Sequence, residues 1–227
     1  MVANFVEVLH GNDGFWIDPD TQAVGLDKGA AIAATTFLAN IIDLGVSPRL
    51  VTSYSETESF NQFVAGERLR LRSWPYFWRQ ARLDLDSSVG VAPVVTADGA
   101  AAQGCRGGWG FGIPRRGAHP EAAKRAIAFF PSADAQRAFV LDSGHLPSRK
   151  ALFTDPEIVE RYPFFPALLG TIANGSVFRP QIPQYDQASH ILQHYLWEVL
   201  ADETTPAAAI AQAAAETREL LSASPGR

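Results

Sequence analysis

Cysteine is nearly absent from this sequence, with Cys105 its single example among 227 residues. A lone cysteine excludes an internal disulfide and any metal site built from several thiolates. The redox compartment stays open, because both the cytosol and the periplasm hold proteins without disulfides. Stability must come from a buried core, and 47% hydrophobic residues over this length are enough to form one.

Long apolar runs are also missing. No window approaches the roughly 18 uninterrupted apolar residues that cross a bilayer, so we expect a chain that is soluble as given. The first ten residues lack the basic start, the apolar stretch and the small-residue cleavage site of a secretory signal. We therefore expect nothing in the chain as written to export it.

Positive charge is in deficit. The chain has 19 Lys and Arg against 24 Asp and Glu, a formal net charge of -5, so nucleic acid is not an expected partner. One local run is basic, and with nearby aromatic residues it superficially suggests single-stranded nucleic acid. We interpret it instead as an exposed strand face followed by a solvated loop; it comprises Arg68, Arg70, Arg72, Arg79 and Arg82.

Apolar residues at three- and four-residue spacing predict six helices. Their ranges are about 27–44, 58–65, 119–130, 132–142, 186–200 and 205–221. Alternating or apolar runs predict strands at 68–72 and 89–93 and after the glycines of 107–113, with a turn or hairpin upstream of residue 27 and a loop or short strand at 144–149.

Enzyme motifs are lacking. No nucleophile elbow, phosphate loop or zincin helix occurs, and the glycines of 107–112 lack the context of a dinucleotide site. His190 and His194 have metal-compatible spacing, but no carboxylate or cysteine joins them in sequence, so we interpret them as a solvent-facing pair. Carboxylates such as Glu56 and Glu58 are suited to acid–base work, but the sequence does not show that they face a partner.

An aromatic run is the most informative feature that is present. Trp74, Tyr76 and Trp78 lie within five residues, and such planes with a few polar groups suit a small-molecule cleft. Packing in the core explains the same run equally well. Both interpretations stay open on these residues alone.

Taken in order, several segments resemble the family 1 extracellular solute-binding proteins, the sugar-binding components of ABC importers. The likeness is strongest to the trehalose- and maltose-binding types and covers nearly the whole chain. The segments that carry it are 60–66 leading into Trp74-Pro-Tyr-Phe-Trp78, then 107–113, 119–124, 129–136, 144–149, 153–156 and 178–180.

The resemblance implies an α/β fold of the periplasmic-binding-protein-like type II, with one nearly complete C-terminal lobe and a fragment of the N-terminal lobe. It assigns residues 1–106 to the first part of the C-terminal lobe, 107–149 to the N-terminal lobe with its hinge crossing, and 150–227 to the second part of the C-terminal lobe. We expect the crossing near residues 104–110, where glycine permits the dihedral changes of a hinge. The first part of the family pattern is absent from this sequence.

The resemblance also implies a site. Trp74 or Tyr76 would be the plane on which a pyranose stacks, and Glu56 would accept sugar hydroxyls. Gly108 and Trp109 match the glycine-rich segment that reaches the ligand, and Arg179 matches an Arg-Pro arginine. Ser73 stands where asparagine is commoner. We expect Trp74, Tyr76 and Glu56 on one concave surface with Arg179 close by.

The implied function is to bind a disaccharide or oligosaccharide and deliver it to the membrane subunits of an ABC permease. The resemblance implies no cofactor, no enzymatic activity and a periplasmic or extracellular, membrane-associated location. One alternative is a truncated remnant that acts as an interaction or self-association module. The other is a carbohydrate-active enzyme, which requires two opposed carboxylates.

Overall fold

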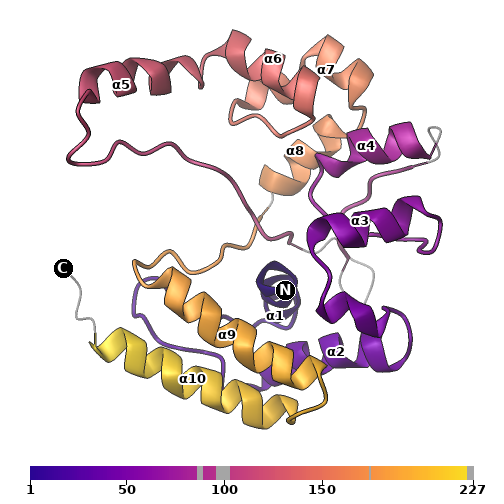
Figure 1. The fold of residues 1–227 in the computed structure, drawn as a ribbon, viewed down its shortest axis with the longest axis vertical. Coiled ribbons are helices and arrows are strands. Elements are labelled where there is room, and N and C mark those ends of the chain that lie inside the picture. The colour runs from indigo at the N-terminus through magenta and orange to yellow at the C-terminus, as the bar shows by residue number, and fades with distance from the viewer. Residues whose placement is uncertain (86–88, 96–102, 174, 224–227) are drawn as a thin grey trace. The chain divides into compact units, whose positions relative to one another are not determined.

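The computed structural model describes residues 1–85, 89–95, 103–173 and 175–223. Its contacts divide the chain into two compact units. Figure 1 shows the ribbon, coloured by residue number. Unit 1 comprises Met1–Tyr54, Val94–Arg106 and Gly175–Arg227, and unit 2 comprises Ser55–Pro93 and Gly107–Asn174. Each unit therefore combines segments that are distant in sequence.

Unit 1 is built on four helices that pack against one another: α1 (Val2–Gly11), α2 (Gly29–Asp43), α9 (Tyr185–Leu200) and α10 (Pro206–Ala223). Each helix presents an apolar stripe to this core, because residues three and four apart lie on one face. On α9 the stripe comprises Ala188, Leu192, Tyr195, Leu196 and Val199, all buried. The short 3-10 helix η1 (Arg49–Thr52) follows α2.

Two separate segments of unit 1 are held side by side by a parallel bridge between Cys105 and Val177. Arg106 N–H donates to the Val177 carbonyl at 2.8 Å, and Val177 N–H donates to the Gly104 carbonyl at 3.1 Å. Glu7 on α1 accepts the Cys105 N–H at 2.7 Å. The backbone immediately before Arg106 is thus fixed from two sides.

Unit 2 is also helical. It contains α3 (Glu56–Val64), α4 (Phe77–Asp84), α5 (Pro120–Phe129), α6 (Ala133–Ser143), η2 (Lys150–Thr154), α7 (Pro156–Arg161) and α8 (Phe165–Ala173). Ser132 caps α6 and Asp155 caps α7, because each side chain accepts a free N–H of the first turn. The core that these elements share is largely aromatic and aliphatic; its members are Val140, Leu152, Phe153, Ile158, Tyr162 and Phe165.

The six predicted helices are confirmed as α2, α3, α5, α6, α9 and α10. The hairpin or turn upstream of α2 is confirmed as well, closed by an antiparallel bridge between Ile17 and Val24. Residues 144–149 form a loop, one of the two predicted outcomes. Helices α1, α4, α7 and α8 were not predicted.

The three predicted strands are wrong. Residues 68–72, 89–93 and 107–113 are irregular, and in the part of the chain that the structure describes only isolated bridges occur. A strand persists only when a neighbouring strand takes up its backbone hydrogen bonds, and these segments lack such a ladder among the described residues. Leu69, expected to point inward, is 97% exposed.

The compact units do not follow the predicted lobe ranges as blocks, since 55–93 groups with 107–174. One unit boundary falls between Arg106 and Gly107, inside the range predicted for the crossing. The assignment of these residues to the lobes of the family stays a prediction. Among the described residues, no helix combines the length and apolar character needed to cross a membrane.

Candidate functional site

Glu56 lies within a capping box at the start of α3. Ser55 accepts the Glu58 N–H at 3.3 Å, and the Glu58 carboxylate accepts the Ser55 N–H at 2.6 Å. This reciprocal pair fixes the first turn of α3. Glu58 is thereby committed to the cap, while Glu56, the first residue of α3, keeps its carboxylate for other partners.

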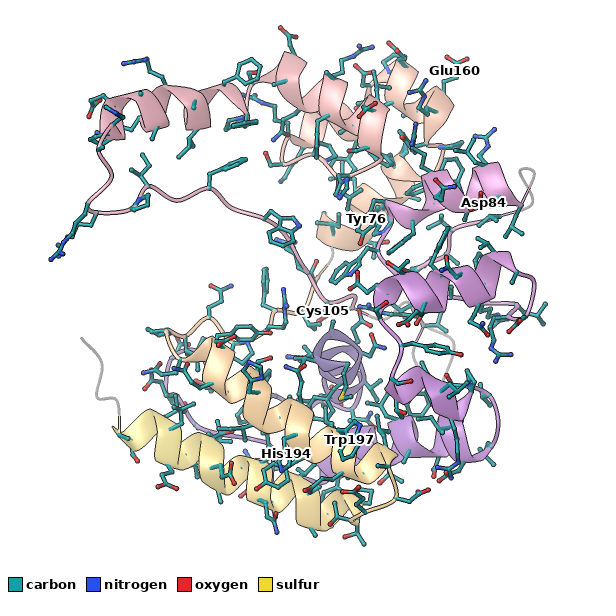
Figure 2. The ribbon with its side chains drawn as sticks, in the orientation of Figure 1. Tyr76, Asp84, Cys105, Glu160, His194 and Trp197 are labelled. Atoms are coloured by element: carbon teal, nitrogen blue, oxygen red, sulfur yellow. The ribbon has the colours of Figure 1, made fainter. Side chains whose placement is uncertain are left out.

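Glu56 joins the two aromatic residues that the sequence singled out. Trp74 Nε1 donates to Glu56 Oε1 at 2.7 Å, and the Tyr76 hydroxyl donates to Glu56 Oε2 at 3.2 Å. Trp74 and Tyr76 lie 18 and 20 residues after Glu56 in the sequence, and all three belong to one compact unit. Figure 2 labels Tyr76, which lies just before α4. The side chains of Trp74, Tyr76 and Glu56 therefore contact one another in unit 2.

Tyr76 is held on its other side as well. Its ring stacks on His145 with centroids 4.5 Å apart, and it contacts Phe77 at the same separation. Burial raises the pKa of the Tyr76 hydroxyl above its ordinary value, and the neighbouring Glu56 carboxylate raises it further. Tyr76 stays a neutral donor to Glu56 at physiological pH.

The Trp74 indole is confined by backbone on one side. A Cβ built on Gly107 would lie 2.9 Å from Trp74 Cη2, closer than real Cβ contacts. Glycine at position 107 therefore permits the indole to lie where it does. The guanidinium of Arg72 lies 5.2 Å from the Trp74 ring centroid, a cation–π distance.

This arrangement suits recognition of a hydroxyl-rich ligand. A carboxylate has about four acceptor positions, and the two bonds from Trp74 and Tyr76 occupy one on each oxygen. Glu56 is exposed, so the remaining positions face solvent. Tyr76 also lines an open hollow of about 500 Å³ with α3 and α4 residues, including Phe60, Phe77 and Arg79.

The other predicted residues each have their own surroundings. Trp109 is 99% exposed, and a Cβ on Gly108 would meet open space. Arg179 belongs to unit 1, where its guanidinium lies 5.6 Å from the Tyr185 ring centroid. Its proximity to Trp74 stays a prediction, and so do the ligand contacts of all six predicted residues.

Sequence reasoning missed three contributors to the cluster. Gly107 was not separated from its neighbour Gly108, although Trp74 contacts the former. Arg72 was assigned to a solvated strand face, and His145 lay unremarked within the motif of residues 144–149. Only the folded structure shows which residue of each sequence segment contacts the cluster.

The histidine pair is exposed on α9, as predicted, yet each imidazole has a carboxylate four residues away. His190 Nε2 lies 3.9 Å from Asp186, and His194 Nε2 lies 3.3 Å from Glu198. Each acid pairs with its own histidine, so neither of these carboxylates joins the two imidazoles. Across the described ranges, no three or more His, Cys, Asp or Glu side chains form a group that could hold a metal ion.

Comparison with known proteins gives a consistent result. The family model for bacterial extracellular solute-binding proteins matches residues 3–137. A probable ABC transporter-binding protein of Deinococcus radiodurans is 24% identical over 203 residues, which are 87% of this chain and 48% of that protein.

Solved structures match over almost the whole chain. Maltose-bound MalE3 of T. maritima is 34% identical, with a TM-score of 0.90 over 97% of this chain and 57% of that protein. The GacH receptor of Streptomyces glaucescens, 21% identical, has a TM-score of 0.80 over 96% of this chain and 56% of its own, and shows the fold alone. The fold is that of type II periplasmic sugar-binding proteins, and the chain spans about half the length of these relatives.

Proposed function

Since this chain belongs to the bacterial extracellular solute-binding proteins, we propose that it supplies the aromatic and acidic sugar contacts of an ABC-transporter binding protein. The observation that supports this most is the Glu56 carboxylate held between Trp74 Nε1 and the Tyr76 hydroxyl. A pyranose has apolar C–H faces and directional hydroxyls, so an aromatic plane beside an anchored acceptor matches both parts.

The substrate class is a disaccharide or oligosaccharide. Trp74 is the stacking plane, Tyr76 and Glu56 bind hydroxyls, and Gly108, Trp109 and Arg179 are the remaining proposed ligand contacts. MalE3, which is 34% identical, was solved with maltose bound, and this favours an α-linked glucose disaccharide as the first ligand to try.

The whole protein delivers its sugar to the membrane subunits of an ABC permease in the periplasmic or extracellular space. Such delivery uses hinge closure that the ligand stabilises by contacting both lobes. The role is one of transport, in keeping with a family of solute-binding proteins.

Titration with maltose, followed by the indole ¹⁵N–¹H resonances, tests the proposal. We expect a saturable shift of the Trp74 resonance, because a sugar on Glu56 perturbs its bond to Nε1. Trp74→Ala should weaken binding roughly tenfold, the scale of one stacking contact. Trp197→Ala is the matched control, since Trp197 is exposed on α9 in unit 1.

Two results would contradict the proposed site. One is an equal loss of maltose affinity in Trp74→Ala and Trp197→Ala, and the other is a maltose titration that leaves the Trp74 indole resonance unchanged. A trehalose titration run in parallel separates the two disaccharides that the resemblance suggests.

A second candidate, self-association, is favoured by one observation in unit 2. Phe111 and Phe130 stack with centroids 4.5 Å apart while remaining 66% and 47% exposed. Exposed aromatic surface of this kind favours association. Elution of the chain from a size-exclusion column as a dimer, lost in Phe130→Ser, is the outcome expected of an association module.

A further inference from the structure

Helix α9 of unit 1 has two exposed histidines that are one turn apart. The side chains of His190 and His194 are 75% and 61% exposed. Residues four apart on a helix lie on one face, with a rise of about 6 Å between them. Figure 2 labels His194, which lies in the second half of α9. The two imidazoles therefore stand in one row on the solvent-exposed side of the helix.

The backbone beneath this pair is held in place by the core of unit 1. Helix α9 is continuous over 16 residues, and it packs against α1, α2 and α10. Its opposite face is buried through Ala188, Leu192 and Leu196. The spacing of the two histidines is thus fixed before any ligand arrives. Pre-organised groups lose little conformational freedom on binding, which favours affinity.

An acid flanks each histidine along the same row. Asp186 lies one turn before His190, with its Oδ1 3.9 Å from the imidazole Nε2. Glu198 lies one turn after His194, with its Oε1 3.3 Å from that Nε2. The sequence of α9 contains no Lys or Arg. Two carboxylates beside two imidazoles, on a helix without basic side chains, favour a cation as the ligand of this face.

Imidazole nitrogen selects the kind of cation. It suits zinc, copper and nickel, whereas magnesium and calcium prefer oxygen ligands. A pair of histidines four apart on a helix is also the spacing that presents two nitrogens to one zinc ion in metalloprotease helices. The part of the chain that the structure describes has no larger group of His, Cys, Asp and Glu side chains suited to a metal, so water would complete the coordination here.

We propose that His190 and His194 form a two-histidine site for a transition-metal cation such as Cu²⁺, Ni²⁺ or Zn²⁺. One ring nitrogen of each imidazole binds the cation, which then joins two consecutive turns of α9. Asp186 and Glu198 act by charge and by accepting the ring N–H that a metal-binding histidine leaves free. The site lies on one helix of unit 1 and does not depend on the proposed sugar contacts of unit 2.

Calorimetric titration of the whole chain with the metal alone is the first test. We expect saturable binding of Cu²⁺ and of Zn²⁺, tighter for Cu²⁺, and none of Mg²⁺. His190→Ala and His194→Ala should each weaken Zn²⁺ binding roughly tenfold or more, because the second ligand of a chelate binds intramolecularly. Both variants should fold, since alanine favours an exposed helix position. His119→Ala is the matched control: this histidine is exposed at the start of α5, in unit 2.

Trp197 provides a local readout of the same site. It is exposed and lies three residues after His194, so the two side chains are neighbours on the helix surface. Paramagnetic Cu²⁺ bound by His194 should broaden the Trp197 indole ¹⁵N–¹H resonance, and His194→Ala should abolish the broadening. Zn²⁺ should also raise the urea midpoint of the chain, because the folded helix sets the spacing of the ligands and the unfolded chain does not.

Three results would overturn the proposal. They are a Trp197 resonance that stays sharp with Cu²⁺, a urea midpoint that does not rise with saturating Zn²⁺, and an equal Zn²⁺ affinity of the His190→Ala, His194→Ala and His119→Ala variants. None of them bears on maltose binding through Trp74, so failure of the metal site is distinguishable from failure of the proposed function.

Discussion

The Glu56 carboxylate makes two hydrogen bonds with different consequences. The bond from Trp74 Nε1 fixes the indole plane, and the bond from the Tyr76 hydroxyl keeps that phenol neutral. Hydrogen bonds to a charged acceptor are stronger than neutral ones, so both aromatic side chains are held by one acid. Removal of the Glu56 carboxylate should therefore affect both the Trp74 ring and the Tyr76 ring.

We predict that Glu56→Gln lowers the pKa of Tyr76. The charge and hydrogen bond of Glu56 favour the neutral phenol, while burial, the larger cause, remains after the substitution. The pKa should move toward the ordinary value of 10.0 without reaching it. Titration of the Tyr76 ¹³Cζ resonance measures this directly. No change, or a rise, would show that Glu56 does not govern the phenol.

We predict that Gly107→Ala displaces the Trp74 indole whereas Gly108→Ala does not. A Cβ at 107 would lie 2.9 Å from Trp74 Cη2, but a Cβ at 108 meets nothing within 4 Å. Gly107→Ala should shift the Trp74 indole resonance and weaken sugar binding several-fold, since misplaced contacts lose ligand affinity. Equal effects of the two alanines would mean that Trp74 does not rely on the space left by Gly107.

A polar contact joins helices α9 and α10. The Tyr195 hydroxyl donates to Glu216 Oε1 at 2.5 Å, and this bond, with burial and the charges of Glu216 and Glu198, raises the pKa of Tyr195 to about 12. Since the folded pKa exceeds the unfolded value of 10.0, the contact stabilises the fold fully below pH 10. That stabilisation is lost as the pH rises toward 12.

We predict that Tyr195→Phe lowers the free energy of unfolding at pH 7 by about 1 kcal/mol, the net value of one hydrogen bond at a half-exposed acceptor. Urea unfolding measures it. Glu216→Gln is the companion variant: it keeps an acceptor but removes the charge, so the pKa of Tyr195 should fall toward 10.0. A Tyr195 that titrates near 10 in the unaltered chain would refute the contact.

Local sequence predicted six helices correctly, whereas the three strands that it predicted are wrong. The α9 stripe and the Thr205-Pro206 start of α10 are local signals, and both helices begin within one residue of their predicted start. The α1 residues Val2, Phe5, Val6 and Leu9 have helical spacing, but this segment was considered only as an export signal. Strand formation depends on a partner elsewhere in the chain, which alternation within 68–72 does not reveal.

At the scale of the whole molecule, the sequence identified the family, while the ligand site stays a prediction. Ordered segments predicted a solute-binding protein, and the family match over residues 3–137 confirms it. Of the six predicted ligand contacts, Trp74, Tyr76 and Glu56 converge within unit 2. The ligand contacts of all six remain predictions, because a linear pattern names a motif without placing its side chains.

The chain spans 57% of MalE3. We expect the chain alone to bind sugar far more weakly than a protein in which the uncovered part of MalE3 is joined to it. Association costs about 4 to 15 kcal/mol of translational and rotational freedom before any affinity appears. One stacked ring and two charged hydrogen bonds, at about 0.5–1.5 and 1.5–3 kcal/mol each, scarcely exceed that cost.

Titration calorimetry with maltose, on the chain alone and on the joined protein, tests this account most directly. We predict millimolar binding for the chain, affinity at least about a hundredfold greater for the joined protein, and a roughly tenfold loss of affinity in its Trp74→Ala variant. Equal micromolar affinity of the two proteins, or a joined protein that is indifferent to Trp74→Ala, would contradict a two-lobe sugar site that includes Trp74.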